Sequence, residues 1–187
     1  MVLRRCASRK GSSRRTTTPY VRKTMRNEDA VNLTIDILPL TRRRVVATDE
    51  NIRSLVNLWY RIVHYNRDIK RHLQSMGNWD VSRVTDMSGL FQDKKDFNED
   101  ISGWDTSKVT NMSRMFSDAT SFNKPIGGWD VSKVTDMSYM FWHAVRFNQP
   151  LGKWDVSCVT DMTEMFVAAD HFNQPVEQWD VSNVITM

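Results

Sequence analysis

Tryptophan recurs every 25 residues between Trp79 and Trp179. Each of these five tryptophans is followed at once by Asp, and then by Ser, Val and Met at three, five and eight residues after the Trp. Four of the five units continue to a Phe-Asn pair. A fixed period between about 20 and 50 residues is the signature of a repeat architecture, in which each unit buries its apolar face against its neighbours. The period therefore limits the fold more than any other feature of the sequence.

The length of the period also limits the shape of one unit. Two-helix repeats need about 33 residues or more, so 25 residues suit a single coil. Residues 101–106 and 109–112 are rich in β-branched and aromatic side chains, which favours short strands, and residues 113–119 favour a short helical turn that starts at a Ser cap. We therefore expect residues 77–187 to form a mainly β fold with short helical turns, a leucine-rich-like parallel β-solenoid of about four and a half coils.

Equivalent residues of successive units should form ladders along this stack. Trp, Val, Met and Phe are expected to fill the interior, and each Asn is expected to hydrogen-bond backbone groups at a turn. The ladder residues to which we assign a structural role are Trp79, Trp104, Trp129, Trp154, Trp179, Asp80, Asp105, Asp130, Asp155, Asp180, Asn98, Asn123, Asn148 and Asn173.

The Asp ladder is the one with a chemical alternative. Asp-x-Ser suits a turn in which the carboxylate accepts a nearby backbone N–H, and we favour this structural role. Stacked carboxylates could instead bind Ca²⁺, or could contact a partner. The repeat lacks the glycine-rich, Asp-dense loops of calcium-binding nonapeptides, which argues against the metal.

An amphipathic helix is predicted within residues 46–76, directly before the repeats. Thr48, Asp49 and Glu50 suit a helix N-terminus, and a helix of about 20 residues follows. Its apolar stripe consists of Ile52, Leu55, Val56, Trp59, Ile62 and Val63. Because a repeat stack needs a terminal element over its first unit, we interpret this segment as a capping helix. The alternative is a free helix that binds a partner.

Residues 1–45 form a basic arm. They hold twelve Lys and Arg against three acids, a net charge of +9, whereas residues 46–187 carry a net charge of −5. We expect an extended segment with one short strand near Leu33, Ile35 and Ile37. The arm suits contact with proteins or anionic surfaces, nucleic-acid binding, or an organelle transit peptide. Its candidate partner-binding residues are Arg4, Arg5, Arg14, Arg15, Arg42, Arg43 and Arg44.

Several function classes lack their usual sequence signals. No apolar run approaches the roughly 18 residues that span a bilayer. The four His residues share no repeat position, and the two Cys residues, Cys6 and Cys158, make neither a disulfide framework nor a zinc site. There is no phosphate-binding loop or dinucleotide fingerprint. We therefore expect no enzyme activity, catalytic residue, metal or cofactor.

The repeat units resemble a known family. WDTSKVTNMSRMF at 104–116 and WDVSKVTDMSYMF at 129–141, each with a later Phe-Asn, are similar to the 25/26-residue repeat of bacterial surface proteins. This BspA-like, leucine-rich-type family was formerly described as a mycoplasma domain of unknown function. The resemblance covers about residues 48–187, and the basic arm has no counterpart in it.

The resemblance implies a structural or protein-interaction component rather than an enzyme. The family also occurs in large DNA viruses, so with the basic arm as an anchor the chain suits a larger assembly, such as a minor capsid protein. A virion or an intracellular assembly is favoured over secretion. The alternatives are a nucleic-acid-binding protein led by the arm, and a surface adhesin-type repeat protein.

The end of the fifth unit carries one further expectation. The sequence stops eight residues after Trp179, and its last segment is more apolar than the equivalent segments before it. An uncovered edge is a template for another chain, so Val184, Ile185 and Met187 are expected to contact a partner or a second copy. The alternative is a frayed end or a chain that was cut short.

Overall fold

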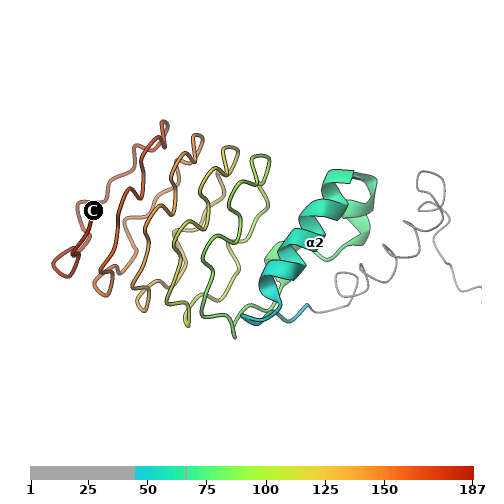
Figure 1. Ribbon diagram of the computed structural model, residues 1–187, viewed down its shortest axis with the longest axis horizontal. Coiled ribbons are helices and arrows are strands. Elements are labelled where there is room, and N and C mark those ends of the chain that lie inside the picture. Colours follow the sequence, from blue (N-terminus) through green and yellow to red (C-terminus); the bar gives the residue numbers. More distant parts are fainter. Residues whose placement is uncertain (1–44, 66) are drawn as a thin grey trace, which may run out of the picture. The chain divides into compact units, whose positions relative to one another are not determined.

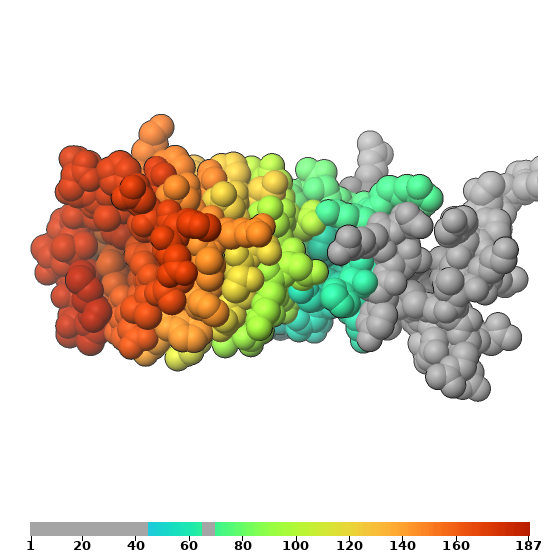
Figure 2. Space-filling view, turned by 90° about the horizontal axis from the view of Figure 1, so that it is seen from above, coloured from blue at the N-terminus to red at the C-terminus, as the bar shows by residue number. Residues whose placement is uncertain are grey.

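The structure, a computed structural model, describes residues 45–65 and 67–187. The helix α2 (Ile52–Tyr65) comes first and is followed by the 3-10 helices η2 (Arg67–His72) and η3 (Met76–Asn78). From Trp79 onward the chain winds into irregular coils that lie one beside the next (Figure 1), and the space-filling view shows successive coils in direct contact (Figure 2). The strand expected near Leu33 lies outside the described residues.

Each coil takes its start from a tryptophan. Coils 1 to 4 begin at Trp79, Trp104, Trp129 and Trp154, and a partial coil 5 begins at Trp179. We number positions by the residues that follow the Trp, so that Asp130 occupies position 1 of coil 3. Equivalent positions of successive coils form a column.

The expected mainly β fold, a leucine-rich-like parallel β-solenoid, is wrong. Within the described residues no strand forms, and neighbouring coils pair only through isolated parallel bridges at position 7, such as Asp86 with Asn111 and Asn111 with Asp136. The side chain at position 7 explains why pairing stops there. The Asn111 side-chain carbonyl accepts the Ser113 N–H at 2.9 Å, so this N–H is not free to extend a ladder between coils.

Reverse turns also replace the helical turn expected at residues 113–119. The Met115 N–H donates to the Met112 carbonyl at 3.2 Å, and the Ala119 N–H donates to the Phe116 carbonyl at 2.9 Å. The third residue of each turn, Arg114 or Asp118, has a positive φ of 56° or 57°. This conformation is the one that a type II turn requires, and it is unusual for residues other than Gly.

The interior of the stack is built from columns of aromatic rings. Phe91, Phe116 and Phe141 are fully buried, and their ring centroids follow one another at 5.5 and 5.6 Å. Trp104 and Trp129 stack at 6.4 Å. In coils 2 to 5 each Trp Nε1 donates to a backbone carbonyl 28 residues earlier, for example from Trp154 to Ile126 at 3.1 Å.

Helix α2 lies beside coil 1 and is shorter than predicted, because its α-helical part ends at Tyr65. The predicted apolar stripe faces inward: Ile52, Leu55, Val56, Trp59 and Ile62 are all buried, whereas Val63 is only half-buried. Burial of side chains of this size stabilises the fold by roughly 1.5–3 kcal/mol each before entropy is counted.

Neighbouring coils are joined by backbone columns of opposite polarity. At position 6 an N–H donates to the preceding coil, as Thr110 donates to the Thr85 carbonyl at 2.8 Å. From position 8 to position 14 alternate N–H groups donate to the following coil, as Gly89 donates to the Ser113 carbonyl at 2.8 Å. Coil 1 follows a helix rather than a coil, so no preceding coil supplies an acceptor for the Thr85 N–H or donors for the carbonyls at positions 7, 9, 11 and 13, which include that of Ser88.

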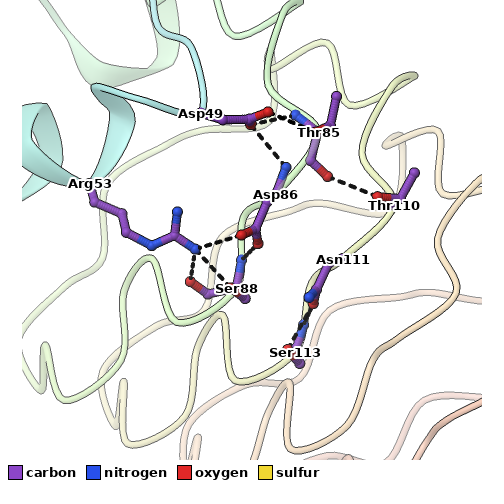
Figure 3. Close-up of polar contacts among 8 residues, drawn as sticks. All are labelled: Asp49, Arg53, Thr85, Asp86, Ser88, Thr110, Asn111 and Ser113. Atoms are coloured by element: carbon purple, nitrogen blue, oxygen red, sulfur yellow. Dashed lines mark hydrogen bonds and ion pairs between the residues drawn. The ribbon is translucent and has the colours of Figure 1, made fainter.

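Two charged side chains take the place of the missing coil at Thr85 and Ser88 (Figure 3). The Asp49 carboxylate accepts from the Thr85 N–H and hydroxyl, both at 2.7 Å, and from the Asp86 N–H at 3.0 Å. The Arg53 guanidinium donates to the Ser88 carbonyl at 2.8 Å and to its hydroxyl at 2.7 Å. The sequence predicts Asp49 to support the helix N-terminus, but the open donors of coil 1 take its carboxylate instead.

Two indole N–H groups at this junction, those of Trp59 in α2 and Trp79 in coil 1, are buried without a hydrogen-bond partner. Trp79 is 3% exposed, and its Nε1 is buried without a hydrogen-bond partner. In later coils this atom donates to a carbonyl 28 residues earlier, and the segment before coil 1 supplies no such acceptor to Trp79. Trp79 therefore carries an unsatisfied donor that Trp154, also 3% exposed, does not carry.

Replacing Asp49 by Ala should lower the free energy of unfolding by about 1 kcal/mol at pH 7, as the loss of a capping side chain does. Burial raises the pKa of Asp49, but the hydrogen bonds from Thr85 and Asp86 and the Arg53 charge outweigh it and hold the pKa below its ordinary value of 3.8. The carboxylate therefore stabilises the fold fully above that value, and its contribution is lost as pH falls through the lowered folded pKa. Urea unfolding between pH 3 and 7 measures this. Glu50→Ala, a neighbouring exposed acid, is the matched control, and an equal effect of both variants would contradict the assignment.

Trp79→Phe should cost less stability than Trp154→Phe. Both changes keep a large ring in a buried site, but only Trp154→Phe removes an existing hydrogen bond, the one from Nε1 to the Ile126 carbonyl, which keeps its bond from the Trp129 N–H. A typical intramolecular hydrogen bond contributes about 0.5–1.5 kcal/mol to stability. Thermal and urea unfolding of the two variants measures the difference, and equal losses would show that the Nε1 bonds contribute nothing.

Candidate protein-binding surface

The Asp column at position 1 forms turns within its own coils. In coil 3 the Asp130 carboxylate accepts from the Ser132 N–H at 3.0 Å and from the Ser132 hydroxyl at 2.7 Å. The same two bonds occur in coils 1, 2 and 4, and the geometry is that of an Asx turn. Hydrogen bonds from Ser lower the pKa of Asp105, Asp130, Asp155 and Asp180. Among the described residues, no three acidic, His or Cys side chains lie close enough together to hold a metal ion.

The column at position 4 adds side-chain donors between coils. The Lys133 ammonium donates to the Ser107 carbonyl at 2.9 Å, and the Asn183 amide donates to the Ser157 carbonyl at 2.8 Å. Coil 4 carries the exposed Cys158 at this position. Lys108 and Lys133 lower the pKa of Asp105 and Asp130 in their own coils. The like charges of Asp130 and Asp180 act on Asp155 in the opposite direction and raise its pKa.

The Asn column at position 19 links the far side of the coils. The side-chain carbonyl of Asn98 accepts the Asn123 N–H at 3.0 Å, and Asn123 and Asn148 repeat this bond at 3.0 and 3.1 Å. Each amide is therefore occupied by the next coil. The Asp, Asn and Trp columns are engaged in building the stack, which leaves the positions that vary between coils as candidates for binding.

Positions 10, 13 and 14, which lie in the reverse turns, are among those that vary. Coil 3 places aromatic rings at all three, and coil 2 places charged side chains beside two of them. We call this cluster the aromatic ridge; it consists of Arg114, Asp118, Tyr139, Trp142 and His143.

Contacts between coils 2 and 3 hold the ridge in place. The Arg114 guanidinium lies over the Tyr139 ring, 4.3 Å from its centroid. The His143 Nδ1 lies 2.6 Å from the Asp118 carboxylate, and the Trp142 ring meets the His143 ring edge-on at 5.6 Å. A cation on an aromatic face and a hydrogen bond between an imidazole and a carboxylate each fix side chains that would otherwise rotate freely. The surface is therefore organised before anything binds.

The backbone below the ridge is equally constrained. Arg114, Asp118, Tyr139 and His143 all have φ between 55° and 57°, in the left-handed region. The Asp118 N–H donates to the Trp142 carbonyl at 2.9 Å, which ties the two turns together. Residues held in this region by their surroundings cost of order 1–3 kcal/mol each, and they persist because hydrogen bonds to neighbouring coils fix them.

A second polar cluster lies between α2 and coil 1. A small pocket of about 50 Å³ is lined by Trp59, Tyr60, Val63, His64, Asp96, Phe97 and Glu99. The Tyr60 hydroxyl donates to the Asp96 carboxylate, and burial together with this bond raises the pKa of Tyr60 to about 12. Lys70 pairs with Glu99, and Lys94 lies 5.4 Å from the Tyr60 ring centroid. These polar groups satisfy one another, so the pocket serves the contact between helix and coil.

The partner-binding residues proposed from the sequence are placed as follows. Arg4, Arg5, Arg14, Arg15, Arg42, Arg43 and Arg44 lie outside the described residues. Val184 is half-buried, while Ile185 and Met187 are 83% and 78% exposed, and the Ile185 N–H donates to the Thr160 carbonyl at 2.8 Å. Their contact with a partner stays a prediction. No helix in the described part of the chain is long and apolar enough to cross a membrane.

Sequence analysis did not single out the aromatic ridge. Its residues differ from unit to unit, whereas ladders are recognised from residues that repeat at the same position. A signal was nonetheless present, because only coil 3 carries aromatic side chains at positions 10, 13 and 14 together. A comparison of what differs between units, position by position, would have found it.

Replacing Cys158 by Lys should stabilise the fold slightly, by up to about 0.5 kcal/mol, because surface charges and exposed hydrogen bonds contribute little. The new ammonium would reach the Ser132 carbonyl, as Lys133 reaches Ser107, and would offset the repulsion around Asp155. Thermal unfolding at low and high salt measures the gain, which should shrink as salt rises. Cys158→Ser controls for loss of the thiol, and an equal gain from that variant would rule out this explanation.

The chain matches the family described as "Mycoplasma protein of unknown function, DUF285", over residues 53–169 and again over residues 125–187. No curated protein and no solved structure matches it. The two matched stretches begin inside α2 and include every coil, which confirms the resemblance at the level of the family. The chain belongs to the DUF285 family.

Proposed function

We propose that this protein is a non-enzymatic protein-interaction component of a larger assembly, and that it binds a protein partner through the aromatic ridge. One observation carries the proposal. Trp, Tyr and Arg, the residue types that dominate binding energy at protein interfaces, gather at one partly exposed site whose side chains are already held in place.

Prior organisation of the ridge favours tight binding. A partner that meets a fixed Tyr139 and Trp142 loses little conformational entropy on the side of this chain. The stack below is stiff, because each coil is hydrogen-bonded to both neighbours through backbone and side chains. The pocket described between α2 and coil 1 is small, and a rigid surface suits a macromolecule better than a small ligand.

Charge favours a protein over a nucleic acid as the partner of the stack. Residues 46–187 carry a net charge of −5, and the exposed Asp column adds a row of carboxylates to their surface. Nucleic-acid binding depends on clustered Lys and Arg that displace counterions from phosphate, and this surface offers the opposite.

Replacing Trp142 by Ser should abolish recovery of the partner. Ser117 occupies the same position in coil 2, so the turn accepts Ser. The full chain is used as bait in an extract of its source, at moderate salt, beside Trp142→Ser and the control Cys158→Lys. A defined set of proteins should be retained by wild type and by the control, and lost by Trp142→Ser. With a purified partner, the dissociation constant should rise roughly 30-fold or more, as for loss of an interface hot spot.

Thermal unfolding must show that Trp142→Ser is folded. If the folded variant recovers the same proteins with the same affinity as wild type, the ridge is not the binding surface. Enzymatic turnover by the purified chain would contradict the non-enzymatic part of the proposal.

A further inference from the structure

We infer that the partner presents an acidic side chain to Arg114, next to an apolar group that packs on Trp142. This inference rests on the proposed function and adds the chemistry of the partner to it. The argument concerns what the Arg114 guanidinium is doing, and what it is not doing, in the structure.

Arg114 is exposed but does not swing freely. Its guanidinium is stacked on the Tyr139 ring at 4.3 Å, and its backbone is fixed by the bond from its N–H to the Ser138 carbonyl at 2.9 Å. Stacking uses the flat face of the guanidinium and leaves its N–H edge available. An arginine held this way is oriented to receive a planar, two-oxygen anion.

The nearby acids do not occupy that edge. Asp118 accepts its contact from His143 at 2.6 Å, and the side chain of Asp118 is only 20% exposed. Glu164 occupies the same position in coil 4 as Arg114 does in coil 2, and coil 3, with Tyr139 at this position, lies between these two coils. Within the described residues, the ring of Tyr139 is the partner that the Arg114 guanidinium has.

Arg53 shows what a guanidinium does when it is used to build the stack. Arg53 donates to Ser88 and pairs with Asp86 at 3.1 Å, so its donors are spent on completing coil 1. Arg114 makes no such bond in the described structure, although it costs the chain a left-handed residue. Trp142, three residues beyond Tyr139 and partly exposed, supplies the apolar half of the site.

A carboxylate fits this arrangement better than a phosphate chain. The ridge contains one guanidinium, with Asp118 and Glu164 in neighbouring coils, so it offers a single planar contact rather than a basic track. Polyanions need several cations in a row to release counterions. One Glu or Asp flanked by apolar side chains needs only the fork of Arg114 and the surface of Trp142.

Two capped peptides test this on the full chain: N-acetyl-Leu-Glu-Leu-amide and its neutral twin N-acetyl-Leu-Gln-Leu-amide. Each is titrated into isotope-labelled protein, and the indole N–H resonance of Trp142 is followed by NMR after assignment through its loss in Trp142→Ser. The Glu peptide should bind about ten-fold more tightly than its twin, as expected for a charge-assisted bidentate contact.

Variants at two arginines separate the site from general charge. Arg114→Gln should abolish the preference for Glu, and Arg114→Lys should keep only part of it, because an ammonium lacks the planar fork. Arg146→Gln, an exposed arginine at position 17 of coil 3, is the matched control and should leave the preference intact.

The outcomes are distinct. Equal binding of the two peptides, no shift of Trp142 with either, or a preference that survives Arg114→Gln would overturn the inference. Stronger binding of an eight-nucleotide oligothymidine at Trp142 would overturn it in favour of nucleic acid. If Trp142→Ser loses the co-purified partner but Arg114→Gln keeps it, the proposed function stands and only the acidic chemistry fails; if both keep it, the proposed function fails as well.

Discussion

Backbone hydrogen bonds between coils, held in place by turns rather than strands, are the interaction on which the rest of this structure depends. Each coil donates backward at position 6 and forward from position 8 to position 14. Because the turns fix one N–H in two toward the next coil, the stack gains a continuous set of bonds without forming a sheet. The polarity of these columns also determines which side chains can cap the first coil. An acidic side chain is needed where backbone donors are open, and a basic side chain where backbone acceptors are open. Asp49 and Arg53 meet these two requirements.

The same hydrogen bonding explains how the protein can vary side chains on its surface without giving up stability. The Trp, Asp and Asn columns are committed to the stack, through Nε1 bonds to carbonyls, Asx turns and amide-to-backbone bonds. The turn positions 10, 13 and 14 make their inter-coil bonds through the backbone alone, so their side chains are free to vary. Coils 2 and 3 use that freedom to bring Arg114 over Tyr139 and Asp118 beside His143. In this repeat protein the residues that build the stack are separate from the side chains that are free to vary, because the inter-coil bonds at the turn positions come from the backbone.

The one place where the pattern is broken at a structural cost is the junction with α2. A helix replaces a coil there, and it satisfies Thr85 and Ser88 but leaves the indole N–H groups of Trp59 and Trp79 buried and unpaired. The apolar side chains of α2, with Trp59 and Ile62 among them, bury enough surface to outweigh two missing bonds. The neighbouring cluster of Tyr60 and Asp96 belongs to this contact as well, because its polar groups are paired with one another across the junction.

The sequence by itself determined the 25-residue period, the number of coils, the inward face of α2 and the Asp-x-Ser turns, because each follows from local spacing or from contacts within three residues. It also predicted the family. Strands were predicted wrongly, since β-branched residues at 101–112 report a preference for extended backbone but not the side-chain bond by which Asn111 captures the Ser113 N–H. Only the tertiary structure decided the roles of Asp49 and Arg53, which lie more than 30 residues from the groups they complete. It alone assembled the aromatic ridge, because Arg114 meets Tyr139, and Asp118 meets His143, only when residues 25 apart in sequence are brought into adjacent coils.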